Sequence, residues 1–113
     1  MNRAIISGRL VRNAHVNGGK SKNKAVKFTL AAKHGFDAKE EKERIEYVPC
    51  VLFVQAKDKL GKFLAAEGKG TFVEIEGRVA SSQFEKDGET KYTTEVVVDK
   101  RSFNIITKPQ TTK

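Results

Sequence analysis

Aromatic side chains that a hydrophobic core cannot readily take up are the residues of this sequence most able to do chemistry. Tyr47 and Phe53 share one parity of the apolar segment 47–54, whose other parity suits a dry core. Phe36 and Phe84 lie in or beside polar segments. Exposed rings can stack on unpaired nucleobases without reading their sequence, at about 1–3 kcal/mol per base. We therefore predict that these four rings bind single-stranded nucleic acid.

The charge balance points to the same class of ligand. Lys and Arg number 22 against 14 Asp and Glu, a formal net charge of +8. This excess favours polyanions, with nucleic acid ahead of an anionic membrane surface. Cations would neutralise phosphates and make binding salt-dependent. From outward strand parity or loop position, we expect phosphate contacts from Lys27, Lys33, Lys57, Lys69 and Arg78.

Catalytic and metal-binding functions find no support in the sequence. His15 and His34 lie on different predicted elements, and with the lone Cys50 they form no metal-ligand spacing. Nucleotide-binding glycine loops and nucleophile elbows are absent. We therefore expect no enzyme activity and no cofactor. The sequence contains neither a signal peptide nor a membrane-spanning apolar run, so we expect a cytoplasmic protein.

Five strands and one helix must position these residues. The strands are predicted at 3–16 (curling at Gly8), 25–33, 47–54, 71–79 and 92–98, the last extended by 102–106. The helix is predicted at 58–67, between the third and fourth strands. Segment 34–44 is expected to be a polar loop that forms a mobile hairpin arm, and Asp87-Gly88 to be the turn of a second arm.

This order of elements fits an all-β, five-stranded Greek-key barrel of the oligonucleotide-binding (OB) type, although other small barrels also have five strands. Residues 1–107 would form the domain and residues 108–113 a flexible tail. Within the third strand, Val51 shares the parity of Tyr47 and Phe53 and is expected beside them on the non-core face. Pro49 is expected to cause a bulge or to lie on an unpaired edge.

Several segments resemble one family when their order and spacing are taken together. They are Asn2–Leu10, Phe28–Ala31 followed by Phe36, the pattern aromatic-x-x-x-Val-x-Phe from Tyr47 to Phe53, Val73–Arg78, and Asp87-Gly88 followed by Tyr92–Val96. Over about residues 2–106 the chain resembles bacterial- and phage-type single-stranded DNA-binding proteins.

The resemblance implies a fold, a ligand and an assembly. It implies an OB-fold that coats single-stranded DNA in replication, recombination or repair, associated with the nucleoid. It implies a homo-oligomer, a tetramer more often than a dimer, built partly through the first strand. The base-stacking positions of the family fall on Phe36, Tyr47, Phe53 and Phe84, although Trp is frequent there in the family and this chain has none.

The C-terminal residues depart from the family pattern. The family commonly ends in an acidic, aromatic-tipped tail that recruits other proteins, whereas Lys108–Lys113 contains no acid. Either this protein never had that tail, as in some phage, plasmid or mobile-element members, or the tail lies beyond Lys113. Two alternatives to DNA coating stay open: an adaptor for primosome or other protein assembly on the same fold, and an RNA-binding barrel.

Overall fold

The computed structural model describes residues 1–19 and 21–108, and their architecture is mostly β. Within these residues lie seven strands, one α-helix and a short 3-10 helix. Their bounds are β1 Ala4–Leu10, β2 His15–Asn17, β3 Asn23–Asp37, β4 Lys42–Gln55, α1 Lys59–Glu67, β5 Phe72–Lys86, β6 Glu89–Val98, η1 Lys100–Ser102 and β7 Asn104–Thr107. No helix in this described part is long and apolar enough to cross a membrane.

The strand count differs from the five predicted, because two short strands separate from longer ones. The predicted strand 3–16 ends at Leu10, and a linking segment crosses to α1 before β2 begins. There the Ala14 N–H donates to the Leu64 carbonyl at 2.9 Å, and the Asn13 amide donates to the Ala66 carbonyl at 3.2 Å. These bonds satisfy carbonyl groups in the last turn of the helix. They take the place of the strand-to-strand hydrogen bonds that a continuous strand 3–16 would make here. Likewise, η1 divides β7 from β6, so 102–106 does not extend the sixth strand.

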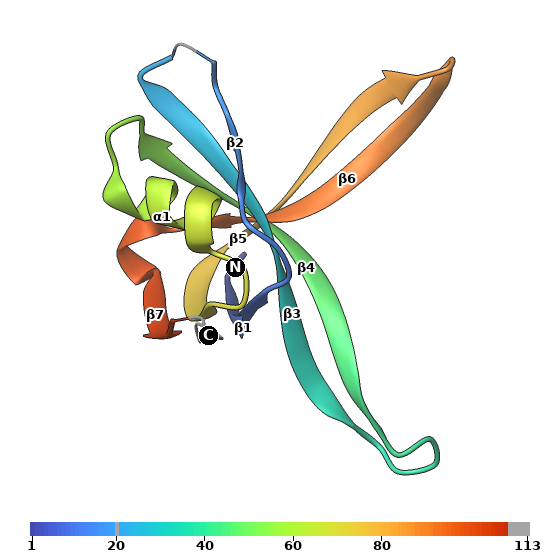
Figure 1. The fold of residues 1–113 in the computed structure, drawn as a ribbon. Coiled ribbons are helices and arrows are strands. Elements are labelled where there is room, and N and C mark those ends of the chain that lie inside the picture. The colour runs from blue at the N-terminus through green and yellow to red at the C-terminus, as the bar shows by residue number, and fades with distance from the viewer. Residues whose placement is uncertain (20, 109–113) are drawn as a thin grey trace.

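Five of the strands pair in a ring. The sheet order is β1-β3-β4-β6-β5, and β1 pairs with β5 as well as with β3. The β4–β6 contact is parallel and short, joining Cys50 and Val51 to Val96 and Val97. β2 and β7 add to the outside of this ring, on β3 and β5 respectively. The ring and α1 form the body of the molecule (Figure 1).

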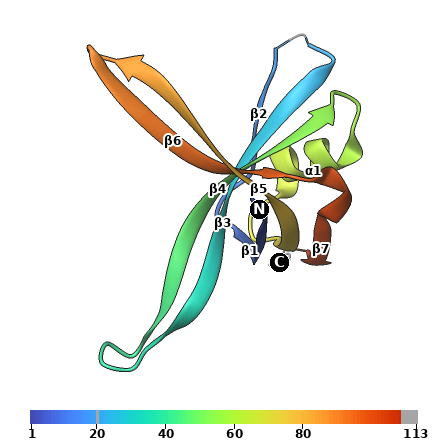
Figure 2. The same cartoon turned by 180° about the vertical axis from the view of Figure 1, so that it is seen from behind.

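Two hairpin arms leave this body in different directions, as both views show (Figures 1 and 2). The first arm is the distal part of β3 and β4, and most of the segment predicted as a polar loop, 34–44, is strand there. Only residues 38–41 turn, with the Asp37 carboxylate accepting from the Lys39 and Glu40 N–H groups. The second arm is β5–β6, and Asp87-Gly88 forms its two-residue turn as predicted, with φ angles of 54° and 78°.

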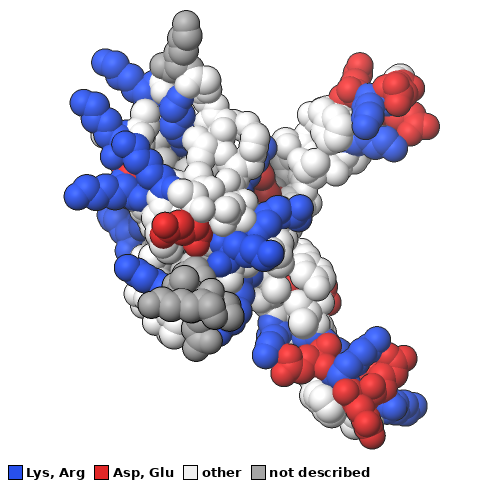
Figure 3. Space-filling model, viewed as in Figure 1, with Lys and Arg blue, Asp and Glu red and all other residues white. Residues whose placement is uncertain are grey.

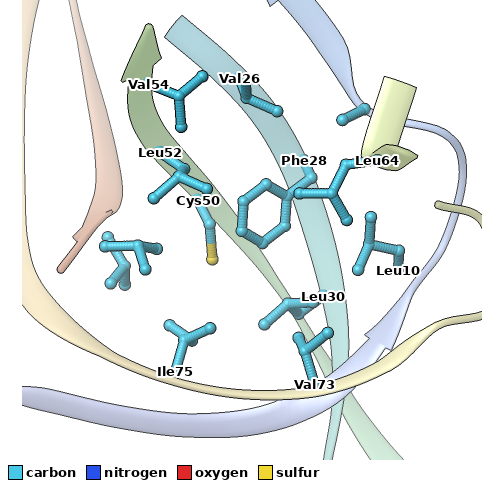
Figure 4. Packing of buried hydrophobic residues seen from close by; sticks show 13 residues of the cluster. Leu10, Val26, Phe28, Leu30, Cys50, Leu52, Val54, Leu64, Val73 and Ile75 are labelled. Atoms are coloured by element: carbon cyan, nitrogen blue, oxygen red, sulfur yellow. The ribbon is translucent and has the colours of Figure 1, made fainter. Parts of the chain in front are cut away.

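The hydrophobic core lies inside the ring and under α1 (Figure 4). Leu30, Leu52 and Val73 are fully buried, with Leu64 of α1 packed against them. A Cβ at Gly61 would lie only 3.1 Å from a Val54 methyl group, so this glycine lets α1 approach the sheet closely. The predicted apolar face of the helix is confirmed, since Leu60 and Phe63 pack on the same cluster.

Pro49 does not distort β4. It pairs with Thr29 in a register that runs without a shift from Gln55 to Ile45. The Thr29 carbonyl accepts from the Val11 N–H on the far side of β3, so Pro49 directs its backbone nitrogen away from β3. On that other edge, β6 pairs only with Cys50 and Val51. The predicted bulge is therefore wrong, and the predicted unpaired edge is where Pro49 lies.

Asp58 links α1 to η1 and makes the fold sensitive to acid. Its carboxylate accepts from the Leu60 N–H at 2.8 Å, as an N-cap does, and pairs with the Lys100 ammonium. The hydrogen bond from Lys100, aided by the Leu60 N–H, holds the pKa of Asp58 below its ordinary value. A carboxyl with a lowered folded-state pKa stabilises the protein above its unfolded-state pKa, and that stability is lost as the pH falls through the folded value.

We therefore expect Asp58→Asn, which keeps a capping oxygen but loses the charge, to lower the free energy of unfolding by at most about 1 kcal/mol at neutral pH. The difference from the wild type should start to shrink as the pH falls below about 4, near the ordinary pKa of an Asp carboxyl, and should disappear once the pH is below the lowered folded-state pKa. Urea unfolding of both proteins across this pH range measures it. A difference that does not change with pH would contradict the role of the Asp58 charge.

Candidate nucleic-acid interface

The face of the sheet opposite the core, here called the outer face, carries the rings of β4. Tyr47 is 64% exposed and Phe53 is 58% exposed. Their partners on β3 are Ala31 and Ala25, whose small side chains leave the rings uncovered. The two rings lie six residues apart on one strand, about 20 Å at the usual rise per residue. The prediction that they share a non-core face is confirmed.

Val51, predicted on the same non-core face, is only 1% exposed. It has the predicted parity, but Lys27 of β3 stands on one side of it and Val97 of β6 on the other. Val51 therefore lies on the non-core face as predicted, but the parallel β4–β6 contact covers its side chain. Between the two rings, the outer face thus has a flat apolar floor at Pro49 and Val51.

Phe36 reaches the outer face through a β-bulge. Its even number would place it with Val26, Phe28 and Leu30, which face the core. However, the register between β3 and β4 shifts between Lys33 and Gly35, and Phe36 then pairs with Glu43. Since Glu43 shares the parity of Tyr47 and Phe53, the extra residue moves Phe36 onto their face. The ring is 61% exposed.

Phe84 lies on the same face, as the strand register through β6 shows. Val51 pairs with Val97, and Val97 pairs with Arg78 of β5. From Arg78 the β5–β6 register runs to the arm's turn without a shift, so Phe84, six residues further on, points to the same side. Its ring is 45% exposed. All four predicted rings therefore lie on one face, traced by register across the four strands β3, β4, β6 and β5.

The four rings are spread out rather than gathered. Phe36 lies on the first arm and Phe84 on the second, and these arms diverge from the body that carries Tyr47 and Phe53 (Figure 1). No single cavity would take such a set of rings. A surface of this length suits an extended, flexible chain with many flat groups.

The predicted cations divide into three groups. Lys27 and Arg78 belong to a row that crosses the outer face as His15, Lys27, Val51, Val97 and Arg78. Lys33 shares the outer face but pairs with Glu43 at 2.9 Å. Lys57 and Lys69 lie in the turns at the two ends of α1, and both are exposed. The register thus places Lys27 and Arg78 on the same face as the four aromatic rings, whereas Lys57 and Lys69 lie outside the paired strands.

Two basic residues near the rings were missed by the sequence reasoning. Arg12 and His15 line a surface cavity of about 280 Å³ together with Lys27 and Pro49, and Glu95 lies on its other side. The cavity falls between Tyr47 and Phe53 along β4. The pairing of His15 with Lys27 depends on β2 being a separate strand. With 3–16 predicted as one strand, a separate β2 that pairs His15 with Lys27 could not be foreseen.

Charge is distributed unevenly between body and arms. Of the 14 acids, five lie between residues 37 and 46 and three between 85 and 89, at the ends of the arms. Figure 3 shows red side chains gathered at both arm ends and blue ones over the body. Phosphates would therefore be attracted mainly to the body and the bases of the arms.

Cys50 offers no reactive thiol. Burial raises its pKa to about 12, and the nearby Glu95 charge acts in the same direction. The thiol therefore stays protonated at neutral pH, which is the unreactive form. Among the residues that the structure describes, no three His, Cys, Asp or Glu side chains are grouped so as to hold a metal ion.

Known proteins match this chain in sequence and in structure. A family model described as the single-strand binding protein family matches residues 1–104. Single-stranded DNA-binding protein 1 of Staphylococcus aureus strain MSSA476 is 29% identical over 104 residues, 91% of this chain and 65% of that protein. Single-stranded DNA-binding protein of Oceanobacillus iheyensis is 28% identical, over 91% of this chain and 63% of that protein. The chain thus spans less than two thirds of the length of these relatives.

One solved structure has the same fold. It is described as Plasmodium falciparum SSB complex with ssDNA, and it superposes with a TM-score of 0.72. The match covers 94% of this chain and 93% of that one at 17% identity. At this identity, the likeness concerns the arrangement of the strands.

Proposed function

The chain belongs to the single-strand binding protein family, and we propose that it binds single-stranded DNA without strong sequence preference. It would coat exposed strands during replication, recombination or repair and shield them from nucleases and re-annealing. The observation that carries this proposal is the set of four exposed rings on one register-defined face of a basic protein.

Stacking and phosphate neutralisation would act together on that face. Bases would lie on Tyr47 and Phe53 at the body, with Phe36 and Phe84 extending the contact along the arms. The backbone between the two body rings would pass over Pro49 and Val51, where Arg12 and Lys27 stand beside the floor. Because duplex DNA hides its base faces, the rings would contribute little to duplex binding.

We assign the fold to the OB type. β1, β3, β4, β5 and β6 make up the ring, and α1 lies between the third and fourth of them in chain order. The pairing of β1 with β5 supports a five-stranded Greek-key barrel, and β2 and β7 would be additions to it. The binding domain would be residues 1–107. Most of the proposed tail, residues 109–113, lies outside the described residues.

We also propose a homo-oligomer, with a tetramer favoured over a dimer. β1 pairs with β5 from Ala4 to Arg9 but with β3 only at Arg9 and Leu10, which leaves one edge open over residues 4–8 in the described chain. Ile5 on this strand is 63% exposed. An open edge with an exposed apolar side chain suits pairing with a second copy. Light scattering measures the mass.

The protein would act by binding alone, without catalysis or a cofactor, and would work in the cytoplasm at the nucleoid. A titration of fluorescent oligo-dT, with duplex DNA and RNA of equal length as competitors, tests the function. We expect the single-stranded DNA to bind most tightly. Equal affinity for duplex would contradict the proposal, and tighter binding of RNA would favour an RNA-binding barrel.

Salt dependence tests the phosphate contact at Lys27. The logarithm of affinity should fall with the logarithm of salt concentration, by about 0.7 per phosphate neutralised on a single strand. We expect Lys27→Gln to make this slope shallower by about 0.7, because one contact is lost. Lys39→Gln, in the turn of the first arm, is the matched control and should leave the slope unchanged. Equal slopes for both variants and the wild type would exclude Lys27 from the interface.

A further inference from the structure

The outer face ends in a cavity of about 430 Å³ where β3 begins and β4 ends. Its lining residues are Lys22, Asn23, Gln55, Ala56 and Lys57. The Ala56 N–H donates to the Lys22 carbonyl at 2.7 Å, which holds the two strand ends together. Among the described residues, no carboxylate lines this cavity.

The register places Phe53 next to this cavity. Ala25 pairs with Phe53, and two residues further along the strands Asn23 pairs with Gln55. The side chains of these two pairs therefore lie next to each other on the same face. The Phe53 and Gln55 positions are therefore about 7 Å apart along β4. The Cβ atoms of Asn23 and Gln55, being cross-strand partners, lie about 5 Å apart. A base resting on the Phe53 ring would have its edge within reach of both carboxamides.

The polar groups of the cavity are available to a ligand. Asn23 and Gln55 are exposed, and within residues 1–19 and 21–108 neither carboxamide has a hydrogen-bond partner on the protein. Each offers an N–H donor and a carbonyl acceptor side by side. Lys22 and Lys57 add two cations, which are without ion-pair partners in the same described residues. A ring, an amide pair and two ammonium groups match the base and the phosphates of one nucleotide.

We propose that this cavity is a nucleotide subsite in which Asn23 and Gln55 read the base that contacts Phe53, with a preference for adenine. The carboxamide of Asn or Gln matches the adjacent donor and acceptor of adenine, N6–H and N7, in two hydrogen bonds. An unpaired adenine offers a second such pair at N1 and the other N6 hydrogen, so both carboxamides can bind one adenine at once. Thymine has a single ring donor, N3–H, and can pair in this way with only one carboxamide at a time. The proposal rests on the proposed function and adds to it one position with base preference in an otherwise tolerant interface.

The test compares labelled dA and dT oligomers of about 15 nucleotides by fluorescence anisotropy. The quantity measured is the ratio of their dissociation constants, in the wild type and in the double variant Asn23→Ala, Gln55→Ala. Self-stacking of dA affects every protein equally and cancels when these ratios are compared. We expect the double variant to shift the ratio roughly fivefold or more toward dT, the loss of one good bidentate contact.

Two control variants separate base reading from other effects. Gln83→Ala removes an exposed carboxamide on the opposite face of the β5–β6 arm, paired with Tyr92, and should leave the ratio unchanged. Lys57→Gln should weaken dA and dT equally, since a phosphate contact carries no base information. An unchanged ratio in the double variant, with binding retained, would overturn the base-reading subsite alone. A wild type that binds neither oligomer would overturn the proposed function.

Discussion

Phe53→Ala and Phe84→Ala are each expected to weaken binding of single-stranded DNA by about 1–3 kcal/mol, a factor of about 5 to 150. Each substitution removes a ring that is roughly half exposed and makes no contact that the core requires. The loss should be similar for different base sequences, because every base has a face that can stack. Anisotropy titrations of labelled oligo-dT measure the effect.

Tyr92→Ala is the matched control for this prediction. Tyr92 is 73% exposed, more than any of the four rings of the outer face, but it pairs with Gln83 and so projects from the opposite face of the arm that carries Phe84. Its removal should leave affinity unchanged. If Tyr92→Ala weakened binding as much as Phe84→Ala, the assignment of one binding face would be wrong. Unchanged affinity in both Phe variants would reject stacking altogether.

Leu52→Ala is expected to lower the free energy of unfolding by about 2–5 kcal/mol. Leu52 is fully buried in the core cluster and pairs with Val26, which is fully buried as well. Truncation removes buried apolar surface and leaves a cavity that the ring of strands can only partly close. For a domain of this size, such a loss is a large part of the total stability. Urea unfolding followed by circular dichroism measures it.

Phe53, the next residue of β4, provides the comparison. Phe53→Ala should change the free energy of unfolding far less than Leu52→Ala, since its ring is 58% exposed. Conversely, the folded fraction of Leu52→Ala should still bind DNA. Consecutive residues of one strand would then affect binding and stability separately, as their opposite faces require. A loss below about 1 kcal/mol for Leu52→Ala would contradict the core described here.

The four rings of the outer face could be predicted from the sequence, because their signals are local. A ring in a polar segment, or on the parity opposite an aliphatic one, is visible within a few residues. The same holds for the Asp87-Gly88 turn and for the helix, whose apolar face recurs at helical spacing. The resemblance to one family implied the same four aromatic positions, and the mostly β architecture with one α-helix in the described residues is as expected.

Only the tertiary structure decided how these elements relate to one another. Side-chain parity specifies a face within one strand, but an extra residue or a non-local pairing changes what that face meets. The bulge beside His34 brings Phe36 to the face of Tyr47, and β6 covers Val51. The turn of the chain toward α1 separates β2 and brings His15 beside Lys27. Such registers join segments far apart in sequence, so no local pattern contains them.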